Sequence, residues 1–187
     1  MGSIGGRSCG INGHLTMAFG EILAASQMSR FDLQFKMGGL DRIEVITLLE
    51  NHLREMAQVS PPESRHALSV DGLRNPDVTF WSVWHRNQVI GCGALKELDA
   101  EHGEIKSMRT TGTHVRKGIG SMILQHTIAE AKRRGYQRLS LETGSMLYFE
   151  PARALYRKFG FQLCPPFNGY VDEPNSVFIT VRLYEET

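Results

Sequence analysis

Long apolar segments, paired cysteines and an excess of either charge are all absent from this chain of 187 residues. No uninterrupted apolar run approaches the ~18 residues that a membrane-spanning helix needs, so we expect no membrane partner. Lysine and arginine number 21 against 20 aspartates and glutamates, which gives a net charge of +1. Because a chain so close to neutral has no strong field to attract nucleic acid, we expect no nucleic-acid partner either.

Cysteine and histidine are too sparse and too widely spaced for a disulfide framework or a metal site. The chain has three cysteines, Cys9, Cys92 and Cys164, and no CxxC pair. Its seven histidines show neither HxxxH nor HExxH spacing, so no metal is expected. Such cysteine usage is typical of a reducing compartment, and the sequence therefore predicts a cytoplasmic protein. Cys92 and Cys164 fall in strand-like segments, where we expect small, buried apolar side chains.

The chain has enough hydrophobic residues for one core, and a glycine-rich segment of different composition precedes it. Hydrophobic residues make up 41% and charged residues 22% of the chain, which fits a single globular domain. Residues 1–27, in contrast, carry six glycines and two charges and lack the basic-then-apolar order of a secretory signal. We interpret 1–27 as a leader or an added tail and 28–187 as the domain. A native N-terminal arm with a short helix over 15–25 is the alternative.

The apolar periodicity from residue 31 onward predicts an α/β (α+β) fold. Asp41 and Glu44 have the spacing of a capping box, and Gly135 is placed to end a long helix. Because that helix joins the strands expected over 104–111 and 138–143, these two strands should be parallel. We therefore expect a mixed sheet of six to seven strands with about four helices on both faces. Helices are expected from 41 to before 61 and over 62–68, 118–134 and 151–158, and strands over 31–36, 78–84, 89–95, 104–111, 138–143, 161–164 and 177–184.

The segment that carries chemistry lies between the strand over 104–111 and the long helix. It reads Arg116-Lys117-Gly118-Ile-Gly120-Ser and opens the helix. Glycines at a helix N-terminus let backbone N–H groups approach an anion, and the helix dipole favours negative charge there. A diphosphate is the ligand that this arrangement predicts, and a tight loop with a glycine helix start is the alternative. The sequence contains neither a GxxxxGK[ST] phosphate loop nor a GxGxxG after the first strand of a βαβ unit.

Residues 31–184 resemble the GCN5-related N-acetyltransferase (GNAT) superfamily in two motifs at the appropriate separation. The window Val115–Gly120 is similar to the family pattern [Q/R]-x-x-G-x-[G/A], except that Val115 replaces the first polar residue. The segment Ala154–Phe161 is similar to the family motif around L-Y-x-K-x-G-F, and residues 140–156 resemble a bacterial subgroup of the family. The resemblance implies the GNAT fold, in which the fourth and fifth strands splay apart.

The resemblance also implies that acetyl-CoA is the cosubstrate and that the acetyl group moves directly to a primary amine of a small molecule or peptide. Backbone groups freed where the two strands splay would hold pantetheine and the acetyl oxygen, and the loop amides would hold the pyrophosphate. The implied cofactor-binding residues are Met108, Arg109, Thr110, Val115, Arg116, Lys117, Gly118, Ile119, Gly120, Ser121, Thr143 and Gly144.

The implied catalytic residues are Tyr156 and Glu104. Tyr156 matches the family position that donates a proton to the departing thiolate; the alternative is a helix tyrosine that packs against the sheet. Glu104 matches the fourth-strand position that serves, through water, as general base in one branch of the family; the alternative is an exposed carboxylate at the start of a strand. Glu142 is a rival base or an internal hydrogen-bond acceptor.

A second function stays open, because a fold does not determine a function. It is a catalytically silent, regulatory module that binds acyl-CoA without turning it over. For the enzyme, Asp172 and Glu173 on one side and Arg65, His66 and Arg74 on the other suggest a zwitterionic acceptor such as an amino acid. We also expect a homodimer, with 177–184 as an exposed sheet edge through which two copies pair.

Overall fold

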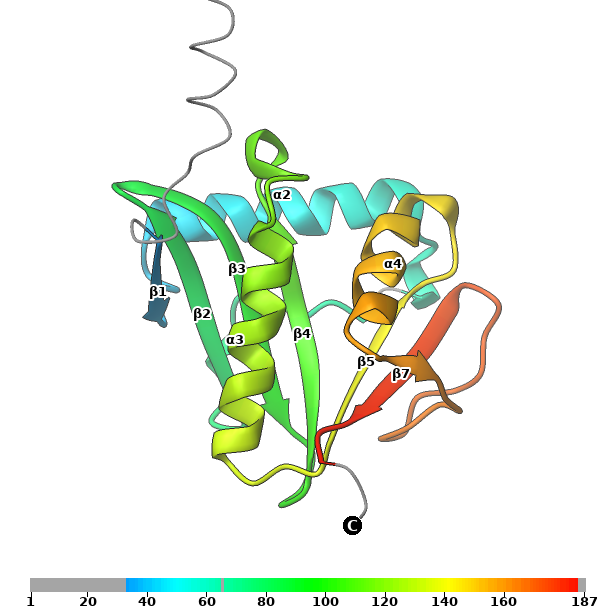
Figure 1. Cartoon of the computed structure of the whole chain (residues 1–187). Helices are drawn as coiled ribbons and strands as arrows, with labels where there is room; N and C mark the ends of the chain where they lie inside the picture. The colour runs from blue at the N-terminus through cyan, green and yellow to red at the C-terminus, as the bar shows by residue number, and fades with distance from the viewer. Residues whose placement is uncertain (1–32, 65, 185–187) are drawn as a thin grey trace, which may run out of the picture. The chain divides into compact units, whose positions relative to one another are not determined.

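The computed structural model describes residues 33–64 and 66–184 (Figure 1). The leader expected over 1–27 and the alternative helix over 15–25 lie outside these residues. The described α-helices are α2 (Ile43–Val59), α3 (Ile119–Arg133) and α4 (Glu150–Lys158). The strands are β1 (Leu33–Met37), β2 (Val78–His85), β3 (Gln88–Glu97), β4 (His102–Thr110), β5 (Arg138–Gly144), β6 (Gln162–Leu163) and β7 (Ser176–Arg182).

The described strands form one mixed sheet of seven, in the order β1-β2-β3-β4-β5-β7-β6. As predicted, β4 and β5 are parallel, because α3 carries the chain back across the sheet between them. The pairs β2–β3, β3–β4, β5–β7 and β6–β7 are antiparallel. The expectation that the last strand is an edge is wrong: β7 lies between β5 and β6. The two-residue strand β6 pairs with the side of β7 that faces away from β5, with Gln162 opposite Thr180 and Leu163 opposite Ile179.

Helices cover both faces of the sheet, and each face has its own apolar core. Trp81 packs with residues of α3 and α4, whereas Trp84 packs with residues of α2. The two tryptophans of β2 are an odd number of residues apart and therefore point to opposite faces. In Figure 1, α3 and α4 lie in front of the sheet and α2 crosses behind it.

The helix starts differ in part from the expectation. The prediction of a capping box at Asp41 and Glu44 is wrong. Arg42 is the N-cap of α2, and no described side chain caps this helix. The N–H of Arg42 donates to the carbonyl of Gly39 in the turn before the helix, and the carbonyl of Arg42 accepts the first helical bonds, from Val45 and Ile46. The helix expected over 62–68 is a single 3₁₀ turn, Pro62–Ser64, so three rather than about four α-helices are described. Gly135 ends α3 as predicted, with φ 83°.

The feature that positions the site is the divergence of β4 and β5. Their pairing covers three positions, from His102 opposite Arg138 to Glu104 opposite Ser140, after which the strands separate (Figure 1). The register between β3 and β4 shifts beside Ser107, which has φ 49° and marks a β-bulge. The splayed strands implied by the resemblance are therefore confirmed.

Candidate active site

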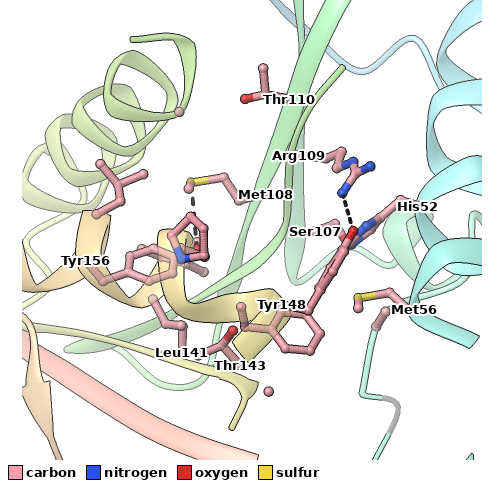
Figure 2. Close-up of a pocket in the computed structure, with 18 of the residues that line it drawn as sticks. His52, Met56, Ser107, Met108, Arg109, Thr110, Leu141, Thr143, Tyr148 and Tyr156 are labelled. Atoms are coloured by element: carbon pink, nitrogen blue, oxygen red, sulfur yellow. Dashed lines mark hydrogen bonds between the residues drawn. The ribbon is translucent and has the colours of Figure 1, made fainter. Parts of the chain in front are cut away.

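A cavity of about 510 Å³ occupies the gap between the divergent ends of β4 and β5. Residues of α2, the start of α3 and α4 complete its wall, and Figure 2 shows 18 of the residues that line it. Three residues expected in the site do not line the cavity: Glu104, Lys117 and Ile119. The expected site residues that do line it are Met108, Arg109, Thr110, Val115, Arg116, Gly118, Gly120, Ser121, Thr143, Gly144 and Tyr156.

The glycine loop brings backbone donors to one end of this cavity. Arg116 and Gly118 both have positive φ, 60° and 83°, a conformation that turns successive N–H groups to one side and favours anion binding. No side chain caps α3, so the N–H groups of its first turn have no capping acceptor. The Ile119 side chain is buried in the core, which leaves only its backbone to serve a ligand.

Two glycines of the site also permit close packing. A Cβ at Gly120 would lie 3.2 Å from Cδ2 of Leu155, so this glycine lets α3 approach α4. A Cβ at Gly144 would lie 2.2 Å from the Phe149 ring, which is not possible without a shift. The carbonyl of Gly144 accepts a hydrogen bond from the Arg153 guanidinium, which also donates to the carbonyl of Met146 at 3.0 Å. This contact secures the chain where β5 ends.

Tyr156 presents a buried hydroxyl to the cavity from α4. The side chain is 6% exposed, and its ring packs edge-on against Phe161. Its hydroxyl contacts the sulfur of Met108 at 4.0 Å (Figure 2). Burial raises the pKa of Tyr156 above its ordinary value, so the group is a protonated hydrogen-bond donor throughout the neutral range.

On the α2 side of the cavity, Arg109 enters a polar cluster that the sequence analysis missed. Its guanidinium pairs with the Glu55 carboxylate and lies 3.4 Å from the Tyr148 hydroxyl, which donates to Glu55 at 2.8 Å. His52 lies beside them (Figure 2), and its buried Nδ1 has no hydrogen-bond partner among the described residues. Burial and the nearby Arg109 charge lower the pKa of His52 to about 4. The sequence feature that could have pointed to His52 is its spacing: it follows Leu48 by four residues and therefore lies on the apolar face of α2.

Glu104 is enclosed rather than exposed. It is 1% exposed, and its carboxylate accepts hydrogen bonds from Lys106 Nζ at 3.2 Å and from the Tyr170 hydroxyl at 2.7 Å. Lys106 also donates to Tyr170 at 2.7 Å. Burial and the Glu104 carboxylate raise the pKa of Tyr170. The alternative of an exposed strand-start carboxylate is therefore wrong.

The charges expected to face one another across the acceptor entrance are arranged differently. His66 and Glu173 pair with each other at 2.9 Å. Arg74 binds Asp71 and the carbonyl of Leu40, both at 2.8 Å, and does not line the cavity. Arg65 lies outside the described residues. The structure therefore gives no support to the zwitterion expectation.

Burial of the cysteines follows the sequence prediction in one of two cases. Cys92 is fully buried, and burial raises the pKa of its thiol to about 12. Cys164 follows β6 instead of lying within it and is partly exposed. Among residues 33–64 and 66–184, no group of three metal-binding side chains comes together, and no helix is long and apolar enough to cross a membrane.

The fold and the splayed-strand cavity define the acetyltransferase class, and the comparisons agree. Residues 45–161 match the model of the acetyltransferase (GNAT) family, and the chain belongs to this family. It is similar to the uncharacterized N-acetyltransferase YsnE of Bacillus subtilis (strain 168), with 56% identity over 151 residues, 81% of this chain and 100% of that protein. It is 49% identical to the uncharacterized N-acetyltransferase YedL of Escherichia coli (strain K12) over 150 residues, 80% of this chain and 94% of that protein.

A solved structure supports the same architecture. The GNAT family acetyltransferase from Elizabethkingia anophelis, crystallised with acetyl-CoA bound, matches with a TM-score of 0.57. The match covers 82% of this chain and 99% of that one at 18% identity. The expected fold and the expected enzyme class, an N-acyltransferase of the GNAT family, are confirmed.

Proposed function

We propose that this chain transfers an acetyl group from acetyl-CoA directly to a primary amine of a small molecule or peptide. The observation that carries the proposal is Tyr156, which lines the cavity and whose hydroxyl, among the described residues, contacts only the Met108 thioether. A thioether is a weak acceptor, so the hydroxyl remains available to a departing thiolate. Burial raises the pKa of Tyr156, so its hydroxyl is a weak acid. We therefore expect the hydroxyl to give its proton to the thiolate at the same time as it receives a proton from the amine nitrogen.

For the cosubstrate, we assign the pyrophosphate to the N–H groups of residues 116–121. The positive φ of Arg116 and Gly118 and the uncapped start of α3 support this assignment. Pantetheine would run between the diverging strands, beside residues 108–110 of β4 and residues 143–144 of β5. The acetyl-CoA bound in the Elizabethkingia anophelis neighbour is consistent with this choice of cosubstrate.

Two measurements test the proposal together. Isothermal titration with acetyl-CoA and CoA measures binding, and free-thiol release measures turnover over a panel of primary amines. We expect micromolar binding and amine-dependent thiol release. Tight binding with no thiol release from any amine would support the silent acyl-CoA-binding module instead, and absence of binding would exclude both functions.

The homodimer and the cytoplasmic location stay predictions. Among the described strands, β1 and β6 stand at the two ends of the sheet order, so we expect strand pairing between two copies to use one of them rather than β7. Light scattering at micromolar concentration measures the mass, and a monomer would contradict the dimer.

A further inference from the structure

The carboxylate of Glu142 stands apart from the other acidic groups near the cavity. Of the described residues that line the cavity, Glu142 is the only one that carries a carboxylate. It lies on β5 between Leu141 and Thr143, which also line the cavity. Glu104, in contrast, is enclosed by Lys106 and Tyr170 and does not reach the cavity.

Three basic side chains that line the cavity have acidic partners, whereas Arg116, which also lines it, forms no ion pair with a described residue. Lys106 pairs with Glu104, Arg109 with Glu55, and His66 with Glu173. Glu142 forms no ion pair with a described residue, and its carboxylate accepts a hydrogen bond from the Ser176 hydroxyl at 2.8 Å. A carboxylate that faces a cavity without a counter-ion is complementary to a cationic ligand.

Resting on the proposed function, we infer that Glu142 binds the acceptor's ammonium group and takes its proton. The acceptor class that fits is a primary amine without a carboxylate beside the amino group. A neighbouring carboxylate would be brought close to Glu142, and like charges repel. This replaces the zwitterionic acceptor with a simple cationic amine.

The step balances with Glu142 as the base. The ammonium gives one proton to the Glu142 carboxylate and becomes a neutral amine. The amine nitrogen forms a bond to the thioester carbonyl carbon, the carbon–sulfur bond breaks, and the thiolate takes the Tyr156 proton. The nitrogen's second proton restores Tyr156. The products are the amide, CoA thiol and one proton, which Glu142 returns to solvent.

The surroundings of Glu142 suit this role. The pKa of Glu142 is raised, chiefly by burial and in smaller part by the Glu104 charge. The Ser176 hydroxyl and the nearby His66 and Lys106 act in the opposite direction. A carboxylate with a raised pKa is a stronger base than one in water and is therefore better matched to a proton on nitrogen. Glu173, on the loop before β7, lies 3.2 Å from the same Ser176 hydroxyl and pairs with His66.

The acceptor class is tested with matched pairs of amines and amino acids: tyramine with tyrosine, histamine with histidine, and phenethylamine with phenylalanine. We expect thiol release at pH 7 to be at least tenfold faster, in kcat/KM, for the amine of each pair that reacts. Faster reaction of the amino acids would overturn the inference. Thiol release from no amine in this set or the wider panel would instead contradict the proposed function itself.

The role of Glu142 is tested with Glu142→Gln, using the amine that reacts best. We expect acetyl-CoA affinity within threefold of the unmodified protein and kcat/KM lowered about 100-fold at pH 7. The defect should shrink toward pH 9.5, where the amine loses its proton without help; a merely structural defect would not depend on pH in this way. Glu130→Gln, which removes a carboxylate of α3 outside the cavity, is the matched control. A Glu142→Gln variant within threefold of the control at pH 7 would overturn the inference.

Should Glu142→Gln fail to fold, Ser176→Ala tests the same point. It removes the hydrogen bond that lowers the pKa of Glu142. The acidic limb of the kcat/KM profile should therefore move to higher pH. An acidic limb that stays in place would overturn the assignment of Glu142 as the base.

Discussion

The two ends of the β4–β5 pair use polar residues in opposite ways. At the bonded end, His102 Nε2 lies 2.8 Å from the Ser140 hydroxyl, which donates to Thr180 Oγ1 at 2.8 Å. Thr180 in turn donates to the carbonyl of Leu139 at 3.0 Å, and Arg138 contacts His102 Nδ1 at 3.0 Å. Each of these groups has a partner inside the protein, so the network joins β4, β5 and β7.

At the open end, the polar groups are left without strong partners. The Tyr156 hydroxyl contacts a thioether. Within the part of the chain that the structure describes, Nδ1 of His52 has no partner and no side chain caps α3 at Gly118. Such groups cost stability in the unliganded chain, and they are the groups that a ligand can satisfy. The comparison therefore separates residues that hold the sheet from residues that serve the reaction.

The largest effect is expected at the glycine loop. Gly120→Glu should weaken acetyl-CoA binding between about fivefold and about a thousandfold, because a carboxylate ~4 Å from the phosphates costs about 1 to 4 kcal/mol. Gly120→Ala is the matched control: its Cβ would lie 3.2 Å from the flexible end of Leu155 and 3.9 Å from Thr110 Oγ1, and it adds no charge. Isothermal titration measures both. Equal affinities for the two variants would show that the loop does not hold the phosphates.

The next effect concerns turnover. Tyr156→Phe keeps the ring packing and removes the hydroxyl, so it should lower kcat about 100-fold while acetyl-CoA affinity is retained. Tyr184→Phe removes a hydroxyl that binds the carbonyl of Lys132 outside the cavity and should leave kcat unchanged. Thiol-release kinetics compare the two. An unchanged kcat for Tyr156→Phe would mean that another group or water protonates the thiolate.

The open end should also make the protein sensitive to acid. The pKa of His52 is about 4 in the folded chain against 6.5 as its ordinary value, so the unfolded chain binds this proton first. The free energy of unfolding should therefore fall as pH drops through 6.5, with His52 contributing a loss of about 2 kcal/mol between pH 7 and pH 5. Urea unfolding of the native protein and of His52→Asn measures this contribution. An equal acid loss in both proteins would contradict it.

The smallest effect is expected at the bonded end, and on a different quantity. Ser140→Ala breaks the chain of hydrogen bonds from His102 to Thr180 and should lower the free energy of unfolding by about 1 to 3 kcal/mol. Because Ser140 does not line the cavity, kcat and acetyl-CoA affinity should not change. Urea unfolding and thiol release measure the two quantities on one preparation. A loss of kcat without a loss of stability would show that the bonded end takes part in the reaction, contrary to the structural role assigned to it.

Much of the fold could be predicted from local pattern. Apolar periodicity placed all seven strands near their observed ranges, and the left-handed position after α3 was recognisable because glycine adopts it without strain. The parallel pairing of β4 and β5 followed from the helix between them. The position of β7 could not be predicted, because β6 covers it with two residues whose pairing partners lie far along the chain.

By itself, the sequence determined the elements, the family motifs and the glycine loop, since each depends on residues that are close together in the chain. Only the tertiary structure decided which carboxylate faces the cavity. Tyr170 lies 66 residues after Glu104 and encloses it, whereas Glu142 stays in the cavity wall because β5 has already left β4 at that point. The bulge at Ser107 and the cluster of His52 with Arg109 likewise arise from contacts between distant segments. No local spacing encodes such contacts, because burial and charge pairing are set by the folded neighbours.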